Sequence, residues 1–318
     1  MAASFANDCK KKVKITGRKI SVVVPSYNHQ AYVLNAIESV LQQDWLHIDL
    51  IVIDDGSTDR SPQLIADYYR RHGGFRFISR PNQGLIKTVN EGLALAEGEF
   101  FCLLASDDYL PPGSLSRRAA YLLENPDSVA VFGDALQLTG DKLSGQRVMD
   151  AKRRRLFDLA DPIPEFIKGV NLPIHTMMAR TEIFRNIGGF DRRYQYCEDL
   201  DPQLLLYLAG PIRFVDVPVY CLRQHQTNSS RTNPHVARAD KVLLYRKYLE
   251  EVPQLAPYRK LIRQQLARQY LLLGRYLSKA SNPSDLERKI FAGALKYCWR
   301  DIRLLWHLLF LRLRGTIN

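Results

Sequence analysis

The chain has 318 residues, of which 46% are hydrophobic and 25% charged, with 18 glycines and 16 prolines. These values are ordinary for globular proteins and exclude collagen-like, disordered and disulfide-scaffold classes. The length fits one large α/β domain with an additional segment. The net charge is +12, and residues 235–318 carry +11 of it, so the excess positive charge is concentrated at the C-terminal end.

The five cysteines are odd in number and far apart, and no pair has the spacing of a metal finger or a CxxC motif. This pattern is typical of reduced thiols in a cytosol. The basic N-terminus lacks the apolar stretch of a secretory signal. The longest uncharged run near the C-terminus, residues 304–311, is far shorter than the roughly 20 residues of a spanning helix. We therefore expect a cytoplasmic protein.

The first 110 residues alternate between runs typical of strands and stretches with helical periodicity. We expect strands at 20–25, 49–54, 75–79 and 99–105, and helices at 29–43, 60–72 and 84–98. Alternation at this spacing predicts right-handed βαβ units and a parallel sheet covered by helices on both faces. The fold class predicted from this pattern is α/β, with a Rossmann-like, mostly parallel sheet.

Further along the chain the pattern becomes mixed. We expect a helix at 113–125, a strand at 128–135, a mobile polar loop at 140–155, a helix at 198–208 and a strand at 212–219. The last 80 or so residues are helical in pattern and contain no strand signal. A helical extension should therefore follow the sheet.

Polar clusters follow three of the predicted strands: residues 25–28, 54–59 and 106–108. Ligands of open parallel sheets bind outside the carboxyl ends of the strands. One such cluster is also typical of a turn with a capping residue, but capping does not require acidic pairs at two strand ends. Asp107 and Asp108 repel each other unless a proton or cation lies between them, and a divalent cation with oxygen ligands fits this need.

The chain contains neither GxGxxG nor GxxxxGK[ST]. Both motifs cradle phosphates through glycine-rich turns. Dinucleotide oxidoreductases and P-loop enzymes are therefore disfavoured.

Seven motifs occur in the order VVVPSYN, IVIDDGSTD, RPNQGL, LLASDDYLPPG, IGGFD, YCEDLDPQLLL and RQHQTNSS. Together they resemble glycosyltransferase family 2, inverting enzymes of the GT-A fold that use nucleotide-diphospho-sugars. The resemblance extends from about residue 19 to residue 230. It implies a GT-A domain (19–234) with donor (19–110) and acceptor (111–234) halves. The basic N-terminal segment (1–18) and the basic helical region (235–318) lie outside the resemblance and are expected from charge and pattern.

The resemblance also implies roles for individual residues. Residues expected to bind the donor are Pro25, Tyr27, Asn28, Asp54, Asp55, Asn82, Gly84 and Asp107, with assistance from Arg80. Residues expected to hold Mg or Mn are Asp107, Asp108 and His225. The family often has a further Asp two residues before Asp107, and this chain has Ala105 there. This departure leaves open which carboxylate coordinates the cation.

On the acceptor side, the resemblance makes Asp199 the catalytic base, with Glu198 beside it. A carboxylate must take the proton of the attacking hydroxyl, and the start of a helix favours its anionic form. The alternative is that both acids only stabilise the first helical turn. Gly189, Phe190 and His175 are expected to line the acceptor side.

Residues 286–314 place aliphatic and aromatic side chains on one helical stripe, with Lys and Arg around it. This pattern is typical of a helix on an anionic membrane surface, and also of a helix packed on its own domain. We expect peripheral association with the cytoplasmic face of the inner membrane. No recognised motif supports a nucleic-acid partner.

The resulting hypothesis is transfer of a sugar from a UDP- or dTDP-sugar to a growing glycan, such as a lipid-linked precursor of lipopolysaccharide, capsule or exopolysaccharide. Two alternatives remain. A nucleotidyltransferase would need a basic triphosphate clamp after the first strand, and the sequence there offers none. A non-catalytic glycan-assembly subunit is favoured by Ala105 and disfavoured by the retained Asp107, Asp108 and Asp199.

Overall fold

The computed structural model describes residues 18–139, 142–224, 234–277, 293, 296 and 297. It divides into two compact units, each built from several stretches of the chain. The first, called here the sheet unit, comprises Met1–Asp150, Pro173–Gly189 and Ala209–Gln224. The second, called the helical unit, comprises Ala151–Leu172, Phe190–Leu208 and His225–Asn318.

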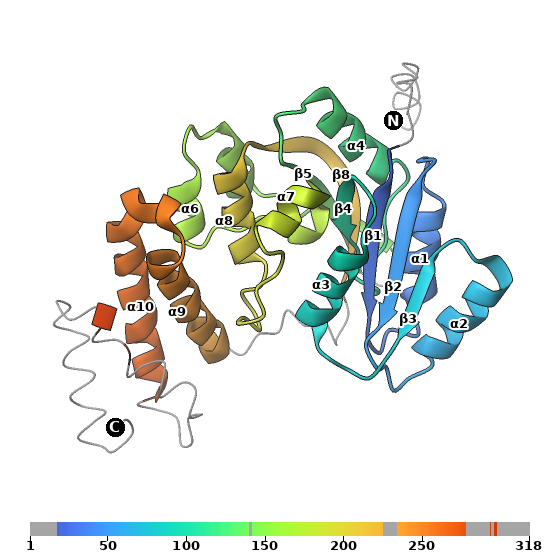
Figure 1. Cartoon of the computed structure of the whole chain (residues 1–318), viewed down its shortest axis with the longest axis horizontal. Helices are drawn as coiled ribbons and strands as arrows, with labels where there is room; N and C mark the ends of the chain where they lie inside the picture. Colours follow the sequence, from blue (N-terminus) through green and yellow to red (C-terminus); the bar gives the residue numbers. More distant parts are fainter. Residues whose placement is uncertain (1–17, 140–141, 225–233, 278–292, 294–295, 298–318) are drawn as a thin grey trace. The chain divides into compact units, whose positions relative to one another are not determined.

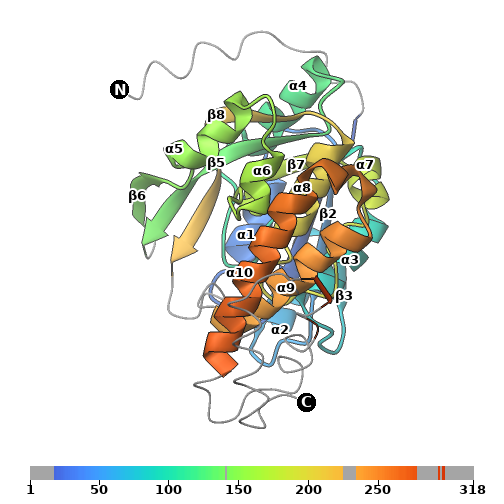
Figure 2. The same ribbon diagram turned by 90° about the vertical axis from the view of Figure 1, so that its left-hand side faces the viewer.

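All eight named strands belong to one sheet within the sheet unit (Figures 1 and 2). They are β1 (Ile20–Ser26), β2 (Ile48–Asp54), β3 (Arg76–Ser79), β4 (Phe100–Leu103), β5 (Ala130–Thr139), β6 (Lys142–Arg147), β7 (Met177–Arg180) and β8 (Ile212–Gln224). The helices of this unit are α1 (Val33–Leu41), α2 (Ser61–His72), α3 (Leu85–Leu95), α4 (Ser114–Glu124), α7 (Thr181–Asn186) and the 3-10 helix η2 (Ile174–Thr176).

The strand order is β3-β2-β1-β4-β7-β5-β6, and β8 pairs with β5. The first four strands are parallel, as the alternating pattern predicts. β7 is antiparallel to both β4 and β5, and β8 runs parallel to β5, beside which it lies in Figure 2. The sheet is therefore mostly parallel but mixed, and the predicted α/β fold class is confirmed.

Side chains alternate between the two faces of β1, as the strand geometry requires. Val22 and Val24 join a buried cluster with α1, α2 and α4. Val23 points to the opposite face, where α3 lies so close that a Cβ on Gly92 would be 2.4 Å from the valine Cγ1. The sheet is thus covered on both faces, which leaves the strand ends as the accessible edge.

The expectation of a mobile loop at 140–155 is wrong over most of that segment. Residues Lys142–Arg147 form β6, and α5 follows at Ala151–Arg154. Arg147 donates from Nε to Oδ2 of the fully buried Asp134, at 2.7 Å. A buried carboxylate needs a partner of opposite charge, and this pairing orders a segment whose polar composition suggested a loop.

The helical unit contains no strand among its described residues. Its elements are α5, η1 (Arg155–Asp158), α6 (Ile163–Ile167), α8 (Leu200–Ala209), α9 (Pro234–Glu250), η3 (Pro253–Tyr258) and α10 (Arg259–Leu277). No helix in the described ranges is both long and apolar enough to cross a membrane.

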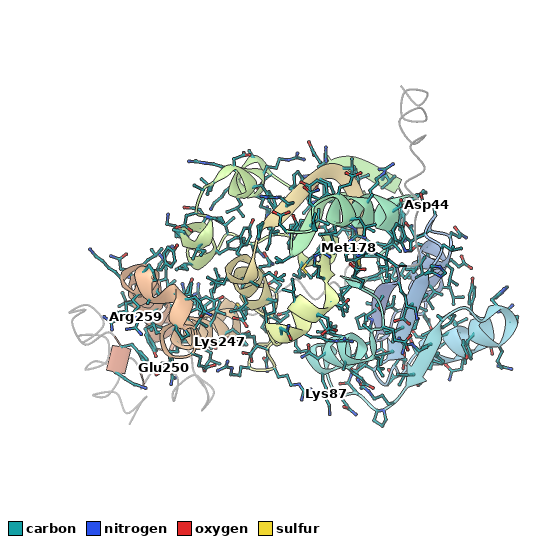
Figure 3. All side chains as sticks on the ribbon, turned by 45° about the horizontal axis from the view of Figure 1, so that its top comes forward. Asp44, Lys87, Met178, Lys247, Glu250 and Arg259 are labelled. Atoms are coloured by element: carbon teal, nitrogen blue, oxygen red, sulfur yellow. The ribbon has the colours of Figure 1, made fainter. Side chains whose placement is uncertain are left out.

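An ion-pair network ties α9 to α8 and to the loop before α8. Lys247, labelled on α9 in Figure 3, donates to Asp191 and to the buried Asp201. Arg193 pairs with Asp191 and Glu251. This network fixes the loop that leads to Glu198 and Asp199.

Candidate functional site

The strand order brings together the three polar clusters that follow β1, β2 and β4, because β1 lies between the other two. Their carboxyl ends point the same way in a parallel arrangement. The predicted gathering of acidic and polar side chains at one edge of the sheet is therefore present in the sheet unit.

Asp54 and Asp55 follow β2 but have different environments. Asp54 is fully buried, and its carboxylate accepts hydrogen bonds from the backbone N–H and the hydroxyl of Ser57. Asp55 pairs with Arg80 and accepts from the N–H groups of Gln83 and Gly84, at 2.8 and 2.9 Å. Asp54 thus shapes its own turn, whereas Asp55 connects this turn to the loop after β3.

The approach of these two loops depends on Gly56. Its φ is +75°, and a Cβ there would lie 2.5 Å from the backbone nitrogen of Asn82. Asn82 and Gly84, both predicted donor-binding residues, are exposed on this loop.

Residues after β1 complete the same edge. Pro25 is buried in β1, while Tyr27 has 47% of its surface exposed. Asn28 has a positive φ of 56°, and its Oδ1 accepts from the N–H of Thr58 at 2.7 Å. The loops after β1 and β2 are therefore joined, with the Tyr27 ring presented to solvent beside them.

Asp108 is held from both sides. Its Oδ2 accepts from the Tyr220 hydroxyl at 2.8 Å, and its Oδ1 from the backbone N–H of Arg223 at 2.7 Å. Tyr220 also accepts from the N–H of Ala105, at 3.0 Å. Burial and the nearby charge of Asp107 raise the pKa of Asp108 above its ordinary value. Asp108 is fixed in the sheet unit rather than directed outward.

His29 and Arg223 lie beside Asp107, and sequence reasoning assigned neither a role. His29 Nδ1 is 2.8 Å from the Ser106 hydroxyl, and its Nε2 is 3.8 Å from Asp107 Oδ2. Arg223 donates from Nε to the Asp107 carbonyl, and its guanidinium lies 4.8 Å from the Tyr32 ring centre. The signal for Arg223 was present, because it opens the RQHQTNSS motif.

Two histidines were predicted to belong to the site, His225 as a metal ligand and His175 on the acceptor side. His225 lies outside the described residues. His175 lies in η2 with its ring centre 4.5 Å from that of Tyr220, and burial lowers its pKa to about 4. The imidazole of His175 is therefore neutral near pH 7.

In the helical unit, Asp199 and Glu198 come just before α8. Asp199 Oδ2 accepts a hydrogen bond from the side-chain amide of Asn171, at 3.0 Å. Burial raises the pKa of Asp199, and the Asn171 amide and the charge of Lys241 oppose that rise. Burial raises the pKa of Glu198 to about 7, and its Oε2 has no hydrogen-bond partner among the described residues.

Gly189 and Phe190 belong to the GGFD turn. Gly189 has a φ of +61°, and a Cβ there would lie 2.8 Å from Oδ1 of Asn90. Phe190 is only 4% exposed. Both residues are closely packed, and their predicted contact with an acceptor stays a prediction.

Among the described residues, no group of three His, Cys, Asp or Glu side chains could hold a metal ion by itself. Mg²⁺ is commonly bound by one or two carboxylates together with substrate phosphates and water. Asp107, with the His29 imidazole beside it, fits such a shared site. The Asp108 carboxylate already has two hydrogen-bond donors, so it fits a supporting role better.

Comparison with known proteins gives one family. The model of the family described as "Glycosyl transferase family 2" matches residues 21–188. A chondroitin synthase of Escherichia coli is 33% identical over 211 residues, which cover 66% of this chain and 30% of that protein. An uncharacterized glycosyltransferase of Haemophilus influenzae is 29% identical over 187 residues, 57% of each chain. The matched stretches thus cover little more than half of these relatives at most.

Solved structures agree on the fold. TarS of S. aureus, solved in complex with UDP-GlcNAc, has a TM-score of 0.62 and 23% identity, covering 87% of this chain and 79% of that one. The mannosyltransferase PcManGT of Pyrobaculum calidifontis, solved with GDP-Man and Mn²⁺, has a TM-score of 0.54 and 15% identity, covering 95% and 87%. On the family match and the shared GT-A fold, the chain belongs to glycosyltransferase family 2.

Proposed function

We propose that the protein is an inverting glycosyltransferase that moves a sugar from a UDP- or dTDP-sugar to a hydroxyl group of a growing glycan. The single observation that carries this proposal is the gathering of the β1, β2 and β4 ends in the sheet unit of a family 2 chain. The UDP-GlcNAc in the TarS structure supports a uridine nucleotide. The chondroitin synthase among the relatives supports glycan extension, and a lipid-linked precursor would be a suitable acceptor.

The donor's base and ribose would occupy the edge formed by the joined loops after β1, β2 and β3. Tyr27 offers an exposed aromatic face there, and Asp55 lies under the loop that carries Asn82 and Gly84. Asp55 is held by Arg80 and two backbone N–H groups, so its carboxylate is fixed in position. It could accept the ring N–H of a pyrimidine through a remaining lone pair.

Asp107, with His29 beside it, would hold the divalent cation, Mg or Mn. When bound, the cation would neutralise the diphosphate leaving group. Tyr220 and Arg223 keep Asp108 in place behind this carboxylate. Ala105 removes a family carboxylate from this position, so we expect this chain to depend on Asp107 more strongly than relatives with the additional acid.

Asp199 would accept the proton of the acceptor hydroxyl as that oxygen attacks the anomeric carbon. A general base works best when its pKa lies near the operating pH and when its anion is oriented. Burial moves the pKa of Asp199 upward, which is the direction that a general base needs, and the hydrogen bond from Asn171 orients its carboxylate. Glu198, whose pKa is about 7, is the second titratable group of this loop.

The test has two steps. A thermal-shift panel of nucleotide-sugars, with and without Mn²⁺, should identify the donor through its stabilisation of the folded state. With that donor, Asp199→Asn should bind normally but lose at least about 1,000-fold in transfer rate, because the base is gone. Asp161→Asn, at an exposed carboxylate in the same unit, is the control and should retain full activity. A transfer rate of the Asp199→Asn variant equal to that of the wild type would refute the assignment of Asp199 as the base.

Ala105 supports a second candidate, a non-catalytic glycan-assembly subunit that keeps the fold. This alternative predicts donor binding in the panel with no transfer to any glycan acceptor by the wild-type chain. Transfer that depends on Asp199 would eliminate it.

A further inference from the structure

Two segments of the helical unit that are distant in sequence meet at the Asp199 carboxylate. Asn171 lies 28 residues before Asp199, in the stretch after α6, and its Nδ2 donates to Asp199 Oδ2. Nothing in the motif pattern connects Asn171 to this site, because it lies between the recognised motifs.

Gln203 holds the two segments together. It is completely buried in α8, four residues after Asp199. Its Oε1 accepts from the N–H of Leu172 at 2.7 Å, and its Nε2 donates to the carbonyls of Leu172 at 3.0 Å and Asp199 at 2.8 Å. A buried amide with both ends used is costly to disturb, since each group left unpaired loses its solvation without replacement.

The backbone of Asn171 has a second support. Arg153 donates from Nε to the Asn171 carbonyl, at 2.9 Å. The backbone on both sides of the Asn171 side chain is thus fixed, by Arg153 at residue 171 and by Gln203 at residue 172. Its amide can therefore act on Asp199 as a rigid donor.

We propose that Asn171 and Gln203 form a brace that orients the Asp199 carboxylate and favours its anionic form, which makes Asn171 a positioning residue for proton abstraction. The inference rests on the proposed function, in which Asp199 is the base. A hydrogen bond to the charged form of a carboxylic acid favours that form. The brace thus counteracts the burial that raises the pKa of Asp199.

The other groups that act on Asp199 are Lys241 on α9, which favours its anion, and Glu198 and Cys197 on its own loop. Lys241 is unchanged in the variants proposed below. A change in the titration of Asp199 in those variants would therefore report the amide.

The first test is the pH dependence of transfer by Asn171→Ala. Without the amide the pKa of Asp199 rises, so the acid limb of kcat/KM should move upward by about one pH unit, which lowers kcat/KM by up to about tenfold on that limb. The KM for the donor should not change. Asn125→Ala is the matched control: it removes an equally half-buried asparagine amide that donates to the Tyr121 carbonyl in α4, and should leave the pH profile unchanged.

Gln203→Met tests whether the brace acts as one unit. It should shift the acid limb in the same direction as Asn171→Ala, and the double variant should shift it no further than the larger single effect. Additive shifts would show that Gln203 acts independently of Asn171 and would overturn the brace. If Gln203→Met does not fold, the Asn171 variant still decides the question.

Carboxyl ¹³C NMR titration of Asp199 separates this inference from the proposed function. The pKa of Asp199 should be higher in Asn171→Ala than in the wild type, whether or not the chain transfers sugars. An unchanged pKa would overturn the inference, even if Asp199→Asn is inactive. Activity of Asp199→Asn, by contrast, would overturn the assigned base and leave the measured pKa shift as it is.

Discussion

The buried carboxyl group of Asp108 lowers the free energy of unfolding when it is ionised, although it belongs to the candidate site. Its side chain is 3% exposed, and burial raises its pKa above the ordinary value. The folded state therefore holds the proton more tightly than the unfolded state. As pH rises from the ordinary pKa through the raised one, the carboxyl group ionises first in the unfolded state. The unfolded state is thereby stabilised relative to the folded state, and the free energy of unfolding falls.

We expect Asp108→Asn to stabilise the cation-free protein by about 1–3 kcal/mol at pH 8 and to have little effect at pH 4, because only the ionised carboxylate carries the cost. Urea unfolding at both pH values measures the difference. Asp127→Asn, which removes an exposed carboxylate, is the control and should change stability by less than about 0.5 kcal/mol. An equal effect of Asp108→Asn at both pH values would contradict the argument.

At this scale the sequence indicated which acids follow the strands but not what each of them does. Asp54 and Asp55 are adjacent acids of the same motif. Asp54 accepts hydrogen bonds within its own turn, whereas Asp55 connects that turn to the loop after β3. The partners of Asp108, Tyr220 and Arg223, come from a strand more than 100 residues away. Such partners depend on tertiary packing, which no local pattern records.

At the level of elements, the accuracy of prediction followed the strength of the local pattern. The long β-branched runs of β1 and β2 and the periodic helices between them were predicted within a few residues. The short β7, MMAR, has neither alternation nor β-branched residues and was missed. The strand expected at 212–219 continues to Gln224, because β5 pairs with β8 up to that residue, with register shifts between Phe132 and Ala135.

The joined loops after β2 and β3 give a prediction for Gly56→Ala. The new Cβ would meet the Asn82 backbone and also require a positive φ, so we expect a loss of about 2–4 kcal/mol in unfolding free energy and weaker donor binding. Gly73→Ala is the matched control, since Gly73 has a φ of +64° with open space around its Cβ position. It should lose less than Gly56→Ala, because it bears only the cost of the backbone conformation (φ +64°, ψ −146°), about 1–3 kcal/mol. Equal losses for the two variants would show that the close approach is unimportant.

At the scale of the whole molecule, the concentration of positive charge after residue 234 remains to be explained. The candidate membrane helix at 286–314 lies almost entirely outside the described residues, so its role stays a prediction. In the described part, α10 carries exposed Arg259, Lys260 and Arg263 and no acidic residue. Both segments could contribute to attraction toward an anionic lipid surface.

A glutamate variant tests this attraction by replacing four basic residues, Arg300, Arg303, Arg312 and Arg314. Each basic residue near the surface contributes about 1 kcal/mol to binding of an anionic membrane, so sedimentation of the variant with vesicles rich in anionic lipid should fall at least tenfold. The comparison variant replaces Arg259, Lys260 and Arg263 with glutamine. It should reduce sedimentation with the vesicles less than the glutamate variant does if the apolar stripe of 286–314 provides the anchor. Unchanged sedimentation of the glutamate variant would favour packing of that segment on its own domain.

The most direct test of the account is calorimetric titration of the identified nucleotide-sugar, or of its nucleoside diphosphate, into the wild type and Asp107→Asn, each with and without Mn²⁺. The account predicts that Mn²⁺ strengthens binding to the wild type at least tenfold and that Asp107→Asn loses this gain while it keeps the cation-independent affinity. The same Mn²⁺-dependent gain in both proteins would contradict the assignment of the strand-end carboxylate as the cation and diphosphate site.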